Sequence, residues 1–287
     1  MNNIIEKVFK YFTKALTYFT LSMLLFVIFY IIKEALPIFK EVTLKDFILG
    51  KDWMPIDFGF GTKYGIRYFI LGTLLVSFIA VVISMFISIG VSLFLTIKAS
   101  DSMRRNIFPI IDLLSGIPSV VYGFIALELL SPLFFKFGVK TGNCVMLAAI
   151  VLSIMITPFM ISSVTYTFVN LKNKYMISIK SLGVDEWYGV TTIIIPRAIK
   201  KIILSLILAN CRAMGETMAV MMVMGNAIVF PTILGKGESI ASLIALEMGT
   251  AVRGSNHYYA LYAAGLVLMV IVLIINMILH KFSKEKE

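Results

Sequence analysis

Two charged side chains interrupt an otherwise apolar stretch in the last third of the sequence. Arg212 and Glu216 lie within residues 202–223, a run long enough to cross the hydrocarbon core of a bilayer. An arginine near the centre of such a span costs about 2.5–3.5 kcal/mol on insertion scales, so its side chain should face a bundle interior or water. A guanidinium offers planar, bidentate donors that suit oxyanions. The pair therefore predicts a cationic point that an anion meets as it crosses, with Glu216 poising or gating Arg212.

A structural role for the same pair stays open. Glu216 follows Arg212 by four residues, which places both side chains on one face of a continuous helix. An internal salt bridge between them would then fix helix packing, and Gly215 would allow a close backbone approach. Thr217 in the same span and Ser119 in an earlier one are further candidates to line the pathway. No residue is expected to be catalytic.

The elements that must position these residues are membrane helices. The chain has 287 residues, of which 59% are hydrophobic, and its mean hydropathy of +0.94 is far above that of soluble proteins. The sequence predicts an all-α, polytopic membrane protein with six transmembrane helices, the first of them uncleaved. Residues 1–65 should form the first helix and an external connection, and residues 66–287 the main transmembrane domain. The predicted spans are residues 16–32, 68–97, 107–130, 144–169, 202–223 and 258–279.

The second and third spans carry opposite signals. In the third, Pro118 removes a backbone donor and should kink or break the helix. Broken backbone at membrane depth is tolerated only where protein or a water-lined cavity satisfies it. The second span instead carries small residues that should let it pack closely against a neighbouring helix. These small residues are Gly72, Ser77, Ser84, Ser88, Gly90 and Ser92.

The distribution of Lys and Arg predicts the orientation of the chain. With the N-terminus inside, the inner segments hold fifteen of these residues and the outer segments ten. Both termini are then cytoplasmic, and so is the polar stretch between the fourth and fifth spans, residues 170–201. The short basic loop at residues 98–105 supports the same orientation.

The remaining reactive residue types exclude several classes of protein. Cys144 and Cys211 lie far apart in apolar segments, and the histidines are His257 and His280. These suggest no disulfide framework, no metal site and no His-based catalytic triad. The sequence has no Walker A glycine loop, so any ATPase must be supplied by another chain. We expect no cofactor and no nucleic-acid partner.

The polar stretch has a recognisable spacing. Gly183 is followed by nine residues and then by residues 193–196 (IIIP). This resembles the EAA motif of bacterial ABC-importer permeases, although Ile177-Ser178-Ile179 stand where that motif has Glu-Ala-Ala. The resemblance implies a cytoplasmic coupling segment at about residues 174–196 that inserts into a groove on an ATPase subunit. The coupling residues it implies are Ser181, Leu182, Gly183, Asp185, Glu186, Trp187 and Pro196.

A second resemblance narrows the family. Residues 114–123 (LSGIPSVVYG), 212–220 (RAMGETMAV) and 224–226 (MGN) are similar to the PstC family of phosphate ABC-transporter permeases. This implies a type I (MetI-like) permease fold in a prokaryotic inner membrane. The implied partners are a PstA-like permease, a PstB-like ATPase dimer and an external phosphate-binding protein. It also implies that Arg212 and Glu216 matter for phosphate passage.

Two alternatives remain at this point. The chain could be a permease for another oxyanion, such as molybdate or sulfate. It could also be an ion-driven anion carrier that works without an ATPase, with Asp112, Glu128 and Glu216 as candidates for a proton relay. The coupling-type stretch argues against the second alternative, because such a carrier needs no docking segment there.

Overall fold

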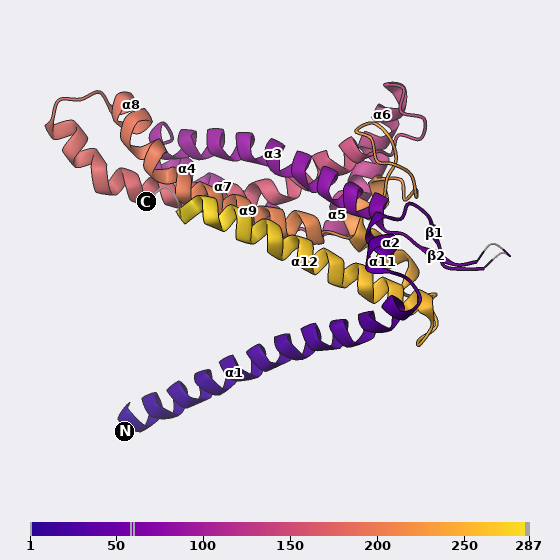
Figure 1. Cartoon of the computed structure of the whole chain (residues 1–287). Helices are drawn as coiled ribbons and strands as arrows, with labels where there is room; N and C mark the ends of the chain where they lie inside the picture. The colour runs from indigo at the N-terminus through magenta and orange to yellow at the C-terminus, as the bar shows by residue number, and fades with distance from the viewer. Residues whose placement is uncertain (1, 58, 60, 285–287) are drawn as a thin grey trace.

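The computed structural model describes residues 2–57, 59 and 61–284 and is almost entirely helical (Figure 1). The long helices are α1 (Asn2–Ala35), α3 (Arg67–Ile97), α4 (Asp101–Gly116), α7 (Val145–Ser181), α9 (Ile195–Gly215) and α12 (Asn256–Lys284). The short helices are η1 (Leu36–Lys40), α2 (Leu44–Leu49), α5 (Ser119–Ile125), α6 (Ser131–Lys136), α8 (Glu186–Gly189), α10 (Met218–Val223) and α11 (Ile240–Glu247), with π-helical turns η2 (Ala126–Leu130) and η3 (Val190–Ile194). Apart from the two-residue antiparallel strands β1 (Trp53–Met54) and β2 (Lys63–Tyr64), the all-α prediction is confirmed.

The membrane class is confirmed as well. In the described part of the chain, five helical segments are long and apolar enough to cross a bilayer: Glu6–Lys40, Arg67–Ile97, Ser119–Lys136, Val145–Ser181 and Asn256–Lys281. The remaining predicted span, residues 202–223, is divided between α9 and α10, and α9 carries Arg197, Lys200 and Lys201 before the span begins. Figure 1 nevertheless shows α9 running alongside α7 and α12.

The two ends of the chain lie toward the same end of the molecule, although α1 diverges from the bundle and keeps them apart. Figure 1 places the N- and C-terminal ends and α8 at one end of the molecule. The hairpin β1–β2, α6 and α11 lie at the opposite end. This arrangement follows from an alternating series of helices that cross the molecule end to end.

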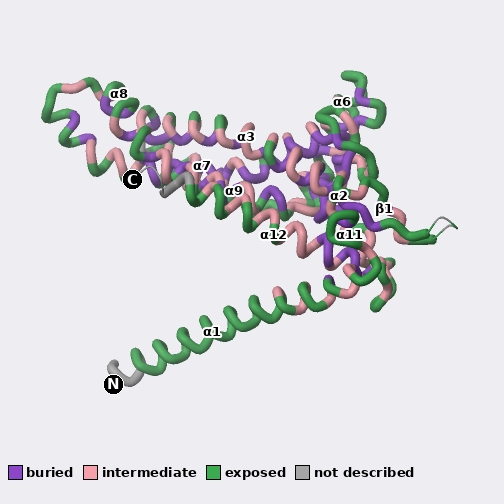
Figure 2. The backbone as a smooth tube through the Cα atoms, viewed as in Figure 1, coloured by how far each residue is buried: buried purple, intermediate pink, exposed green. Residues whose placement is uncertain are grey.

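The centre of the bundle is the contact between α3 and α7, where Figure 2 shows buried residues gathered along both helices. Ser84, Ser88 and Ser92 are fully buried and recur every fourth residue, so they share one face of α3. The Ser88 hydroxyl donates to the Thr157 carbonyl at 3.4 Å, and the Ser92 hydroxyl donates to the Ile161 carbonyl at 3.2 Å. The prediction of close packing through small residues is confirmed for these serines.

Gly90 is a correction to that prediction. It lies on the exposed face of α3, and a Cβ atom added there would meet nothing within 4 Å. Its position in the sequence, between Ser88 and Ser92, places it about 200° around the helix from either serine. A small residue therefore marks a helix contact only when it shares the periodicity of the buried face.

Helix α1 contacts the bundle at one end only. Its Tyr30 ring lies 5.9 Å from the Tyr262 ring of α12. Most of its large apolar side chains are exposed, and the helix diverges from α12 toward its N-terminal end (Figures 1 and 2). The apolar surface of α1 is thus left to lipid or to another membrane subunit.

A polar cluster joins the elements at the end of the molecule opposite α8. Trp53 of β1 is buried, and its Nε1 donates to the Glu247 carboxylate at 2.9 Å. His257 Nε2 lies 2.7 Å from the same carboxylate. Burial, and secondarily the negative charge of Glu247, raise the pKa of the nearby Glu238 carboxyl to about 7. Residues 36–66 pack with α11 and α12 here, and the domain boundary predicted at residues 65 and 66 stays a prediction.

The serine face of α3 makes a prediction about stability. Ser88→Leu should destabilise the protein by about 1–3 kcal/mol, because an extra side chain cannot fit against α7 without strain. The matched control is Gly90→Leu, two residues along the same helix, where space is open. Thermal unfolding in detergent measures both, and equal melting temperatures for the two variants would contradict the packing account.

The raised pKa of Glu238 makes a prediction about pH. Because the folded chain holds a proton that the unfolded chain releases between about pH 4.5 and pH 7, stability falls as the pH rises through that window. Glu238→Gln removes this titration. The variant's melting temperature should therefore exceed that of the native chain by more at pH 8 than at pH 5. A difference that does not change with pH would show that Glu238 titrates normally.

Candidate functional site

The first part of the site is a helix break between α4 and α5. Helix α4 ends at Gly116, and Pro118 takes an extended conformation with φ −58° and ψ 139°. The Tyr122 hydroxyl donates to the Leu114 carbonyl at 2.8 Å, which satisfies a backbone group that the break sets free. The predicted break at Pro118 is confirmed. An open hollow of about 750 Å³ lies beside it, lined by Pro109, Asp112, Leu113, Gly116, Ile117 and Pro118.

The second part is a break between α9 and α10. Helix α9 ends at Gly215, Glu216 is extended with φ −71° and ψ 129°, and α10 begins at Met218. The prediction that Arg212 and Glu216 share one face of a continuous helix is therefore wrong. Gly215 is the physical reason, since glycine is a poor helix former and readily ends a helix. The Thr217 hydroxyl donates to the Gly215 carbonyl at 3.2 Å, across this break.

The two breaks lie close together. Helices α5 and α10 pack through Gly123, where an added Cβ atom would come within 2.9 Å of the Met222 sulfur and 3.0 Å of Ala219 Cα. Arg212 lies in the last turn of α9, three residues before the second break ends that helix at Gly215. Ser119 is half-buried and begins α5, about one turn before Tyr122. The sequence reasoning missed Tyr122, whose hydroxyl bond to the Leu114 carbonyl ties α5 to the end of α4.

Arg212 faces away from its own bundle. It is exposed in the single chain and lies in the last turn of α9, where a cation is stabilised by the free carbonyl groups of a helix end. Among the described residues no ion pair joins it to Glu216. Leu208, one turn before Arg212 on α9, and Phe124 of α5 are also more than half exposed. The site is therefore open on a side that this chain does not cover.

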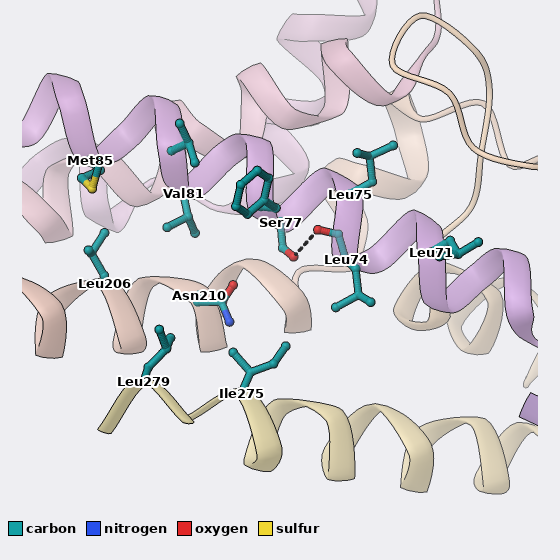
Figure 3. A pocket seen from close by; sticks show the side chains of 12 residues that line it. Leu71, Leu74, Leu75, Ser77, Val81, Met85, Leu206, Asn210, Ile275 and Leu279 are labelled. Carbon is teal, nitrogen blue, oxygen red and sulfur yellow. Dashed lines mark hydrogen bonds between the residues drawn. The ribbon is translucent and has the colours of Figure 1, made fainter. Parts of the chain in front are cut away.

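An apolar hollow elsewhere in the bundle is distinct from this site. It measures about 650 Å³ and lies between α3, α9 and α12 (Figure 3). Figure 3 shows aliphatic side chains such as Leu74 and Ile275 pointing into it, with Asn210 of α9 between them. Asn210 is engaged with the Met214 sulfur at 3.4 Å. With so few polar groups in its lining, this hollow suits hydrocarbon and not an anion.

The predicted coupling segment begins with a glycine cap. Helix α7 continues twelve residues past the predicted span 144–169 and ends at Ser181. Gly183 has φ +67°, its N–H donates to the Lys180 carbonyl at 3.1 Å, and the Val184 N–H donates to the Ile179 carbonyl at 3.3 Å. This hydrogen-bond pattern is a Schellman motif, in which glycine is strongly favoured at the left-handed position. Gly183 therefore reverses the chain at the end of α7.

The next residues hold the reversed chain against α7. The Asp185 carboxylate caps α8 by accepting from the Trp187 and Tyr188 N–H groups at 2.9 and 3.1 Å. Gly189 packs on Ile179, whose side chain an added Cβ atom would approach to 2.6 Å. The departure from the EAA motif at Ile179 thus serves this contact. Pro196 directly follows the π-helical turn η3 within a continuous helical segment, so its missing N–H coincides with the irregular turn.

The predicted coupling residues divide into two groups. Asp185 and Gly183 shape the turn, the Ser181 hydroxyl donates back to the Ile177 carbonyl, and Glu186 lies 3.6 Å from the Lys172 ammonium. Leu182 and Trp187 instead project outward, with 78% and 54% of their surface exposed. Two exposed apolar side chains on a polar stretch outside the membrane form a surface that can dock with a protein.

Among the described residues no cluster of His, Cys, Asp and Glu could hold a metal ion.

Comparison with known proteins agrees with this architecture. The chain is 31% identical over 244 residues to the probable ABC transporter permease protein YqgH of Bacillus subtilis, covering 84% of this chain and 78% of that protein. It is 30% identical over 263 residues to the probable phosphate transport system permease protein PstC of Methanocaldococcus jannaschii, covering 85% and 83%. A solved structure of the MetNI methionine ABC transporter in an inward-facing conformation matches the fold with a TM-score of 0.57 at 16% identity, over 75% of this chain and 92% of the other.

The family follows from these comparisons and from a sequence profile. Residues 88–286, which include both helix breaks and the coupling segment, match the profile of the binding-protein-dependent transport system inner membrane component. The resemblance to PstC permeases is confirmed by several such relatives at about 30% identity. The predicted MetI-like fold is confirmed by the structural match. The chain is a multi-pass membrane protein that belongs to the family of binding-protein-dependent transport system inner membrane components, a family of transport subunits and not of enzymes.

Proposed function

We propose that this chain is the PstC-type permease subunit of an ATP-driven phosphate importer and forms half of its translocation pathway. The observation that carries the proposal is the position of Arg212. Arg212 lies in the last turn of α9, directly before the second helix break, and is exposed on a side that the chain itself leaves open. A guanidinium in such a place binds oxyanions through paired donors. Relatives named for phosphate transport, which match over more than four-fifths of the chain, support phosphate as the anion.

A second permease would complete the pathway. The open face around Arg212 carries exposed apolar residues of α4, α5 and α9, and a PstA-like subunit would cover them. A PstB-like ATPase dimer would bind the coupling surface at Leu182 and Trp187, and an external phosphate-binding protein would dock at the opposite end. The C-terminal end of the chain lies at the same end of the molecule as α8, and α1 is directed toward that end from the opposite one (Figure 1); with the ATPase bound at α8, both termini would be cytoplasmic in the inner membrane of a prokaryotic cell.

The mechanism uses motion of helices and no bond chemistry in this chain. ATP binding and hydrolysis on the partner would move α8, and the helices that follow it would rock so that Arg212 faces outward and inward in turn. Thr217 and Ser119 would line the pathway near Arg212, and Glu216 would lie across the break from it. A single exposed cation gives a weak, transient site, which permits release on the inner side.

The alternatives fit the geometry less well. A carrier without an ATPase would not need the glycine-capped turn that presents Leu182 and Trp187. Its relay candidates are also dispersed, because Asp112 lines the open hollow of the first break while Glu128 lies in the π-helical turn η2. A permease for molybdate or sulfate would use the same guanidinium, so that alternative is separated by competition in uptake assays.

The coupling surface predicts how the complex is assembled. A tagged chain extracted in mild detergent should retain a second permease and an ATPase. Trp187→Ala should weaken the ATPase contact by about 2 kcal/mol or more, as for a buried tryptophan at an interface. The control is Phe86→Ala, which removes an exposed aromatic side chain from the apolar helix α3, far from α8 in the sequence. A chain that purifies alone and still moves solute in liposomes would overturn the importer proposal.

The pathway predicts an effect of Arg212 on transport. Arg212→Ala should abolish ATP-dependent phosphate uptake in proteoliposomes while the complex still assembles, because no other donor replaces the guanidinium. Arg212→Lys keeps the charge but loses the bidentate geometry, so it should retain only part of the uptake. Excess sulfate or molybdate should compete weakly in the native complex. Normal uptake by Arg212→Ala would contradict the role given to this residue.

A further inference from the structure

A single lysine joins three helices at the end of the molecule where α8 lies. Lys172 belongs to α7, and its Nζ donates to the Thr96 carbonyl in the last turn of α3 at 2.8 Å. The same ammonium lies 3.6 Å from Glu186 Oε1, at the start of α8. Its side chain is 26% exposed and that of Glu186 is 40% exposed, so both are partly shielded from water.

The two contacts of Lys172, with the Thr96 carbonyl and with the Glu186 carboxylate, have different physical causes. Thr96 is one of the last residues of α3, whose final carbonyl groups have no partners within the helix. A cation is stabilised at such a helix end by the free carbonyls and by the helix dipole. Lys172 reaches that end from α7, and its remaining donors are available to the Glu186 carboxylate. The ammonium group therefore holds Glu186, the first residue of α8, and the end of α3 at the same point.

This contact is separate from the apolar packing nearby. Val190 and Ile194 of η3 are buried against Phe168 of α7, and Ile97 of α3 lies at the edge of that cluster. The apolar cluster keeps these helices together, but hydrophobic contacts are not directional. Lys172 instead makes a directional hydrogen bond to the Thr96 oxygen and an ion pair with Glu186, so a displacement of α8 can reach α3 through one ammonium group.

We propose that Lys172 is a positioning residue that couples movement of α8 to α3. The inference rests on the proposed function, in which an ATPase partner moves α8. When α8 is displaced, Glu186 pulls on the ammonium group, and the ammonium group moves the end of α3. Helix α3 packs against α7 along the serine face and runs directly into the α4–α5 segment that contains the first helix break. Lys172 thereby links α8 to the pathway, and it acts through these helices and not through contact with the ATPase or the anion.

The test compares ATP hydrolysis with phosphate uptake in the same proteoliposomes, using the complete complex. Lys172→Met keeps the length of the side chain and removes the charge. It should still bind the ATPase, because Leu182 and Trp187 are unchanged, and it should still hydrolyse ATP. Phosphate moved per ATP hydrolysed should fall roughly tenfold, within the range of measured coupling between distant sites. Lys172→Arg should restore most of that ratio, since it keeps the charge and the donors.

Two further variants keep the test decisive. Glu186→Gln leaves the bond from Lys172 to Thr96 in place and should lower the ratio partially, even if Lys172→Met fails to assemble. Lys174→Met is the matched control, because Lys174 is exposed on the same helix and lies 5.3 Å from the Tyr175 ring instead of bridging to α3 or α8.

The outcomes separate this inference from the proposed function. An unchanged ratio in Lys172→Met, or in Glu186→Gln, would overturn the inference alone, provided that the native complex couples uptake to ATP. Equal losses in Lys172→Met and Lys174→Met would overturn it too, because they would reflect lost basic charge and not the bridge. A native complex that hydrolyses ATP without moving phosphate would overturn the proposed function and the inference together.

Discussion

Backbone polar groups cannot stay unpaired inside a bilayer, and the site depends on how this chain satisfies them. Breaking α4 at Pro118 frees carbonyl groups, and the Tyr122 hydroxyl takes up the one on Leu114. Tyr122 is therefore fixed by the break that it stabilises. Its neighbour Gly123 lets α10 approach closely, and α10 follows the second break. The two interruptions lie on helices that pack together, and Arg212 lies directly before the second of them.

Much of this architecture could be predicted from the sequence because it depends on local signals. Apolar runs located the membrane helices, and the second predicted span, residues 68–97, agrees closely with α3 (Arg67–Ile97). Pro118 predicted a helix break because proline lacks a backbone N–H donor. Gly183 stood out by its spacing, and the structure supplies the reason in its positive φ within a helix cap. Each of these features is decided within a few residues of itself.

The rest depended on contacts between distant residues. The spacing of Arg212 and Glu216 predicted a shared helical face, but the chain ends the helix at Gly215 and separates them. Hydropathy could not show that α7 continues to Ser181, since a helix does not stop where the membrane does. Tyr122 and Lys172 bond to carbonyl groups on other turns or other helices. No spacing rule identifies such partners before the fold is known.

The π-helical turn η3 has a consequence for direction. Helices α8, η3 and α9 follow one another without interruption, so the docking turn and Arg212 occupy two ends of one helical segment. A π-helical turn accommodates one extra residue, and each residue of an α-helix turns the chain by about 100°. The turn η3 therefore sets the direction in which Arg212 points around the helix axis, relative to Trp187. Loss or gain of a single residue there would leave both ends folded while aiming the guanidinium at a different neighbour.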